Sequence, residues 1–259
     1  MTDPRPKNST STTGKASAQP LTVYLVLGVL GGLLGAWLLN TFEAQFPVIV
    51  PDDLKGAQGI YNPEQMARIL NEQRRAAHSN APLALGCMGA CLAGAISLAI
   101  GAGLAGTRGA VRGLVTGFIL GGLLTAVGAL VSLQSQESLK NWNTLDATGQ
   151  PDPIKSQLHV MSHQLPTWLG IAAAIGLSTW TVVGTRGRPG HLAGAAALAA
   201  LILLLSFPLL ASLLHTQDTA GVIPQGLPNK LGWCLLGGIL LGGVVGRSVL
   251  KHSDPSHAH

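Results

Sequence analysis

The chain has 259 residues, of which 47% are hydrophobic, only 10% are charged and 34 are glycine. A soluble domain carries about 25% charged residues, so this composition argues against a soluble globular protein. The formal net charge is +5, but the basic residues accompany neither a recognition helix nor an aromatic stacking surface, which argues against nucleic acid as a partner.

After a polar, Ser- and Thr-rich segment at residues 1–20, which predicts a disordered cytoplasmic tail, six long apolar stretches follow along the chain. A helix of about 20 residues, rising about 1.5 Å per residue, crosses a hydrocarbon core of about 30 Å. Inside lipid the backbone must pair its own polar groups, so each stretch is expected to be a helix. The first lacks an A-x-A cleavage site and is interpreted as a retained span. The stretches are 21–39, 83–105, 113–133, 167–184, 192–214 and 231–249.

Two polar segments between the stretches have the signals of short helices. Residues 63–77 follow Asn62 and residues 153–164 follow Asp152, and in both cases the next residue is proline. Asn or Asp at the N-cap with proline at the first helical position favours a helix start. The apolar side of each segment suits a helix that lies on the membrane surface. The predicted fold is therefore all-α and polytopic, with six transmembrane helices and short interfacial helices in the outer loops.

The charges predict one orientation. With the N-terminus in the cytoplasm, the inner side holds nine basic residues and two acids, and the outer side holds seven basic residues and nine acids. The short inner loops, 107–112 and 185–190, carry only basic charge, as the positive-inside rule requires. We therefore expect a multi-pass protein of the plasma (inner) membrane, in contact with the lipid bilayer and with both termini cytoplasmic. Four tryptophans fall near the outer boundary: Trp37, Trp142, Trp168 and Trp233.

The chain also shows signs of an internal repeat. The sequence Gly31-Gly-Leu-Leu recurs as Gly121-Gly-Leu-Leu, and Asn62-Pro63 recurs as Asp152-Pro153, both at an offset of 90 residues. The sequence Gly-Thr-Arg-Gly occurs at both 106–109 and 184–187. These matches favour three two-span units, at about 21–112, 113–190 and 191–251, within a transmembrane domain at 21–251. Residues 252–259 are predicted to be a second disordered cytoplasmic tail.

Glycines spaced four residues apart mark candidate helix-packing faces. Such faces let helix backbones approach closely in lipid, where no hydrophobic force acts between helices. They suit packing within the bundle, and the row of three in the last stretch also suits the interface of a homo-oligomer. The predicted helix-packing residues are Gly28, Gly32, Gly117, Gly121, Gly238, Gly242 and Gly246.

The middle of every stretch lacks Asp, Glu, Lys and Arg, which argues against a pump or an ion-coupled transporter. Hydroxyl side chains leave a passive path open, although such groups commonly bond a carbonyl one turn back. The hydroxyls that could form such a path are Ser97, Thr116, Thr125, Ser178, Thr179 and Thr181.

The histidines and cysteines are the candidate metal ligands. His159 and His163, like Cys87 and Cys91, are four residues apart and share a helix face. Cys234 sits at a depth where it could bind a metal with these thiols or pair with one in a disulfide. Without a C-x-x-C or H-E-x-x-H motif, interfacial histidines and buried free thiols explain both groups, so no metal and no cofactor are predicted.

The sequence shows no nucleophile–base pair and no phosphate-binding loop, so we expect no enzyme and no catalytic residues. The favoured function is a non-enzymatic scaffold or interaction component of a membrane, with a membrane-protein partner or a second copy. The alternative is a passive transporter or channel for a small uncharged solute. A close-packed centre would favour the scaffold, and a continuous hydroxyl-lined cavity would favour transport.

Overall fold

The computed structural model describes residues 19–50, 62–139, 144–145, 149–150, 152–184, 189–213 and 221–253. These form five helices: α1 (Leu21–Phe42), α2 (Pro63–Leu139), α3 (Pro153–Val183), α4 (Pro189–Leu213) and α5 (Leu227–Ser253). All five are long and apolar enough to cross a membrane, which indicates a multi-pass membrane protein. The predicted all-helical character is confirmed for these residues. Most of both predicted tails lies outside them, but residues 252–253 belong to α5 rather than to a tail.

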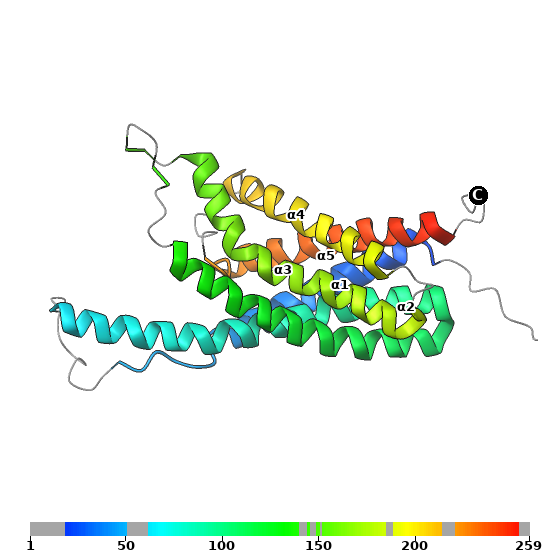
Figure 1. The fold of residues 1–259 in the computed structure, drawn as a ribbon, viewed down its shortest axis with the longest axis horizontal. Coiled ribbons are helices and arrows are strands. Elements are labelled where there is room, and N and C mark those ends of the chain that lie inside the picture. The colour runs from blue at the N-terminus through cyan, green and yellow to red at the C-terminus, as the bar shows by residue number, and fades with distance from the viewer. Residues whose placement is uncertain are drawn as a thin grey trace, which may run out of the picture.

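Helix α2 contains two of the predicted stretches because it folds back on itself at Gly106 (Figure 1). Gly106 has φ 67° and ψ −156°, a backbone conformation that is essentially restricted to glycine. The chain therefore reverses at one residue. Residues 107–112, predicted as an inner loop, are instead the first turns of the returning helix. The two halves of α2, residues 63–105 and 107–139, run antiparallel, with Gly113 against the backbone of Ser97.

The two polar segments predicted as separate interfacial helices are continuous with the helices that follow them. Pro82 lies inside α2 and Pro166 lies inside α3, so neither proline ends a helix. A proline in a membrane helix removes one backbone hydrogen bond and is tolerated where neighbouring helices satisfy the freed carbonyl. At about 1.5 Å per residue, residues 63–105 span about 64 Å, twice the thickness of a hydrocarbon core. In Figure 1 the first turns of α2 accordingly project past the other helices.

The helices pack as a closed ring. Helix α1 contacts α2 and α5, α2 contacts α3, α3 contacts α4, and α4 contacts α5, with a smaller contact between α2 and α5. Trp168 and Trp233 meet edge-to-face in this core, with ring centroids 5.1 Å apart. We call the end of the bundle at the α2 turn the Gly106 end, and the opposite end the Lys230 end. The largest aliphatic core side chains include Leu85, Met88, Leu92, Ile96, Ile100, Ile171 and Ile175.

Candidate functional site

Helices α1 and α5 meet along a seam of glycines. A side chain added at Gly28 would overlap the carbonyl of Gly238, and the reverse also holds. A Cβ at Gly32 would lie 2.6 Å from the carbonyl oxygen of Cys234. Because backbone occupies the space that a side chain would need, the absent Cβ atoms set the distance between these helices.

The other predicted packing glycines also lie against neighbouring helices within the chain. Gly242 faces the backbone of Tyr24, and Gly246 lies under the Tyr24 ring, with the added Cβ 2.8 Å from the tyrosine Cβ. In the α2 hairpin, Gly117 faces the carbonyl of Ala93 at 2.7 Å. The three-glycine row of α5 is therefore covered by α1.

Gly121 occupies the equivalent place one turn further along the hairpin. Its added Cβ would lie 2.5 Å from the carbonyl oxygen of Gly89 and 2.7 Å from the Ala93 Cβ. Gly89 in turn makes room for Thr125, whose hydroxyl would overlap a side chain at that position. The two halves of α2 thus pack as closely as α1 and α5 do.

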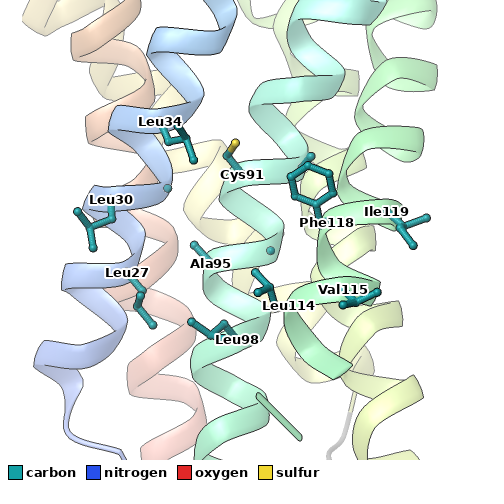
Figure 2. Close-up of a pocket in the computed structure, with 13 residues that line it drawn as sticks. Leu27, Leu30, Leu34, Cys91, Ala95, Leu98, Leu114, Val115, Phe118 and Ile119 are labelled. Atoms are coloured by element: carbon teal, nitrogen blue, oxygen red, sulfur yellow. The ribbon is translucent and has the colours of Figure 1, made fainter. Parts of the chain in front are cut away.

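An open groove runs along the first half of α2 (Figure 2). Helix α1 lies on one side of it, and the returning half of α2 lies on the other. It comprises two adjoining cavities of about 540 Å³ each, which share Ala90, Phe118 and Ile119. The floor is made of small residues on residues 83–98 of α2, about 24 Å of helix. The small floor residues are Gly86, Cys87, Ala90, Cys91, Gly94 and Ala95.

Larger apolar side chains form the two walls of this groove. Figure 2 shows Leu27, Leu30 and Leu34 on the α1 wall, with Leu114, Val115, Phe118 and Ile119 on the opposite wall. Leu30 and Phe118 are 54% and 51% exposed. The groove carries no charged side chain among the residues that line it. In a bilayer this surface faces lipid, so its chemistry suits an apolar chain or helix and no polar solute.

The Lys230 end holds a buried ion pair that joins α1 to α5. The ammonium group of Lys230 contacts the Glu43 carboxylate and donates to the Asn40 side-chain oxygen at 3.2 Å. The Lys230 side chain is 6% exposed and that of Glu43 is 22% exposed. A charge removed from water needs such partners, because unpaired burial is costly. The pair therefore fixes the end of α1 beside the start of α5.

A polar cavity of about 320 Å³ lies beside this ion pair. One wall is the segment after α1, which Asn80 holds through two hydrogen bonds to Phe46. The Phe46 N–H donates to Asn80 Oδ1 at 2.7 Å, and Asn80 Nδ2 donates to the Phe46 carbonyl at 2.8 Å. Amide side chains of Gln73, Gln136 and Gln225 also line the cavity. The lining of this cavity therefore combines amide groups and the Glu43 carboxylate with apolar side chains such as Leu133 and Ile223.

The six hydroxyls predicted as a possible solute path do not line a common cavity among those described above. Ser97 and Ser178 bond each other at 2.6 Å in the core between α2 and α3. Thr179 donates to the Ile175 carbonyl at 2.8 Å, a bond within its own helix. None of the six named hydroxyls lines the groove or the polar cavity.

Two of the other three hydroxyls bond carbonyls of their own helices. Thr116 donates to the carbonyl of Arg112 at 2.7 Å, and Thr181 donates to that of Ser178, also at 2.7 Å. The Thr125 hydroxyl is buried in the α2 hairpin without a hydrogen-bond partner in the described part of the chain. These contacts stabilise helices rather than line a path.

The cysteines and histidines fall into separate groups. Cys87, Cys91 and Cys234 are free thiols, so the disulfide that the sequence left open does not form in the structure. His159 and His163 are in contact, with their Nε2 atoms 3.0 Å apart. Among the described residues, no three His, Cys, Asp or Glu side chains gather as a metal site.

Sequence reasoning missed the groove and the contacts of Lys230 and Asn80. Glu43 and Lys230 lie just outside their apolar stretches, where charged residues are ordinary, and nothing in the sequence pairs the first stretch with the last. The small-residue spacing at Gly86, Ala90 and Gly94 did carry a signal for a close-approach face. No family model matches this chain, and comparison with curated proteins and with solved structures found no match.

Proposed function

We propose that the chain is a non-enzymatic membrane scaffold or interaction component with six spans, two of them contributed by α2. The Gly106 end would face the cytoplasm of a plasma (inner) membrane, with both termini on that side. The described charged residues near this end are all basic: Arg108, Arg112, Arg247 and Lys251. The described acids lie towards the Lys230 end, which supports the orientation through the positive-inside rule.

Two glycines support the division into three two-helix units. Gly106 turns α2 at φ 67° and ψ −156°, and Gly184 ends α3 at φ 62° and ψ −150°. Both glycines begin a Gly-Thr-Arg-Gly sequence. One backbone conformation at equivalent sequence positions is what duplication of a two-helix unit would produce.

The interaction role depends on the α2 arm, which we define as residues 63–75. The arm carries apolar side chains away from the bundle: Met66 is 43% exposed and Leu70 is 45% exposed. The two residues are four apart and lie on one face of the helix. Arg74 and Arg75 are exposed on the same arm. An exposed apolar stripe beside basic residues on a projecting helix suits the docking of another protein.

The packing of the interior favours this role over a passive transporter. The glycine seams bring backbones into contact, and the buried hydroxyls of Ser97, Ser178 and Thr179 bond one another or a carbonyl of their own helix. A transporter for a small solute would need a polar path through the region that these contacts fill.

The arm can be tested by replacing Leu70 with Glu and purifying the protein from native membranes. We expect a protein that co-purifies with the wild type to be lost, because a carboxylate enters the docking face. The matched control is Arg75→Gln, which alters charge on the same arm and leaves the apolar stripe intact. Mass spectrometry identifies the bound species and distinguishes a second copy from another protein. An identical set of bound proteins for wild type and Leu70→Glu would refute the docking role.

The orientation has a separate test. Single cysteines at Ser79 and Arg108, both exposed, are introduced into a chain whose three native cysteines are replaced by alanine. A membrane-impermeant thiol reagent applied to intact cells should label the Ser79 position, and the Arg108 position only after permeabilisation. Labelling of both positions in intact cells would overturn the topology.

A further inference from the structure

Two histidines of α3 form a contact that the proposed function does not use. His159 and His163 are one helical turn apart, with Nε2 atoms 3.0 Å apart and ring planes at 83°. His163 is fully buried, whereas His159 is partly exposed. At this separation one Nε2 atom can donate its proton to the other, so the Nε2 edges of the two rings face each other.

The surrounding structure holds the pair in place. Asp152 caps the start of α3 by accepting from the N–H groups of Ile154 and Lys155. Further along α3, Ser162 donates its hydroxyl to the carbonyl of His159 at 2.7 Å. Thr167, one turn after His163, bonds Ser132 of α2 at 3.1 Å. The ring of His163 is thus buried in a fixed part of the α2–α3 interface.

The distance between the nitrogens allows one metal ion to bind both rings. With metal–nitrogen bonds of about 2.05 Å, nitrogens 3.0 Å apart subtend about 94° at the metal. This angle is close to the 90° of tetragonal Cu(II) and Ni(II) sites.

We propose that His159 and His163 form a two-histidine chelate for a divalent transition metal of the Cu(II) or Ni(II) class. Each neutral ring would bind the metal through Nε2 and hold its proton on Nδ1, so the ring that donates in the metal-free pair would exchange its Nε2 proton for one on Nδ1 through water. Copper should bind more tightly than nickel, following the general order of affinities for nitrogen ligands. Among the described residues no third His, Cys, Asp or Glu joins the pair, so water or an added ligand would complete the coordination. Access would come from the partly exposed His159. The proposal is independent of the docking role of the α2 arm.

The test uses full-length protein in nanodiscs, stripped with EDTA and titrated with Cu(II) in the absence of reductant. The background carries His252→Ala, His257→Ala and His259→Ala, because histidines near the chain end could bind metal on their own. We expect one equivalent of copper, with an electron paramagnetic resonance signal showing two nitrogen ligands. His163→Gln should weaken binding at least tenfold, and so should His159→Gln. His191→Gln, which changes a histidine bonded to Ser248 on other helices, is the matched control and should bind as the background does.

The outcomes are distinct. Equal copper affinity in all variants would mean that the ion binds adventitiously elsewhere, which overturns the proposal. If His163→Gln fails to fold, the signal of the folded background protein decides the question, since the absence of two nitrogen ligands would also overturn it.

Discussion

The glycine seam between α1 and α5 makes a graded prediction. Replacing Gly32 with alanine would place a Cβ 2.6 Å from the Cys234 carbonyl oxygen, where ordinary contact begins at 3.4 Å. The helices would have to separate locally by about 0.8 Å, because the obstacle is backbone and cannot rotate away. Overpacking of this kind costs about 1–3 kcal/mol in the free energy of unfolding.

Two further glycines provide matched comparisons. At Gly35 the nearest atom to an added Cβ is Cγ of the flexible Met88 side chain at 3.2 Å, so Gly35→Ala should be nearly neutral. At Gly194 nothing lies within 4 Å of an added Cβ. Alanine is the better helix former, so Gly194→Ala should stabilise the protein by up to about 1 kcal/mol.

The assay is equilibrium unfolding in mixed micelles, followed by helical circular dichroism. The expected order of stability is Gly194→Ala, then Gly35→Ala, then Gly32→Ala. Equal stability of the Gly32 and Gly194 variants would refute the claim that backbone contact sets the spacing of α1 and α5. A larger loss at Gly35 than at Gly32 would do the same.

Three other changes probe single contacts. Lys230→Met leaves the Glu43 carboxylate without its partner and should lower the free energy of unfolding by about 3 kcal/mol in the same assay. Adding Glu43→Gln should restore stability. A loss below about 1 kcal/mol would show that the pair is not desolvated. Asn80→Ala removes both hydrogen bonds to Phe46 and should lower the free energy of unfolding by about 1–3 kcal/mol. Chymotrypsin should then cut at Phe46 faster than in the wild type. An unchanged cleavage rate would contradict the anchoring role of Asn80. Gly106→Ala forces a side chain into a backbone conformation that favours glycine and should destabilise the protein by about 1–3 kcal/mol. If the variant were as stable as the wild type, the turn would have to adopt another geometry.

The helical, membrane-spanning character was predictable because it depends on local composition. Apolar runs of about 20 residues must be helical in lipid, whatever surrounds them. The prediction of separate interfacial helices was wrong because each segment continues through a proline into the next helix, at Pro82 in α2 and at Pro166 in α3. Whether a proline ends a helix depends on the neighbours that satisfy the freed carbonyl, and those neighbours are distant in sequence.

The candidate site was less predictable for the same reason. Gly28 and Gly238 were each identified as packing residues from their spacing alone. Their contact with each other depends on the order of the helices around the ring, which the spacing of glycines in the sequence does not predict. The groove likewise needs α1 and the returning half of α2 on either side of one small-residue face.

The partnership of α1 with α5 has a consequence for biosynthesis. Glu43 and Lys230 are separated by 187 positions, and the glycine seam joins the same two helices. At about 5–20 residues per second, a ribosome needs roughly 10–40 s to add that length. During this interval α1 would reside in the bilayer with its close-contact face towards lipid or a chaperone, and ring closure would be among the last events of assembly.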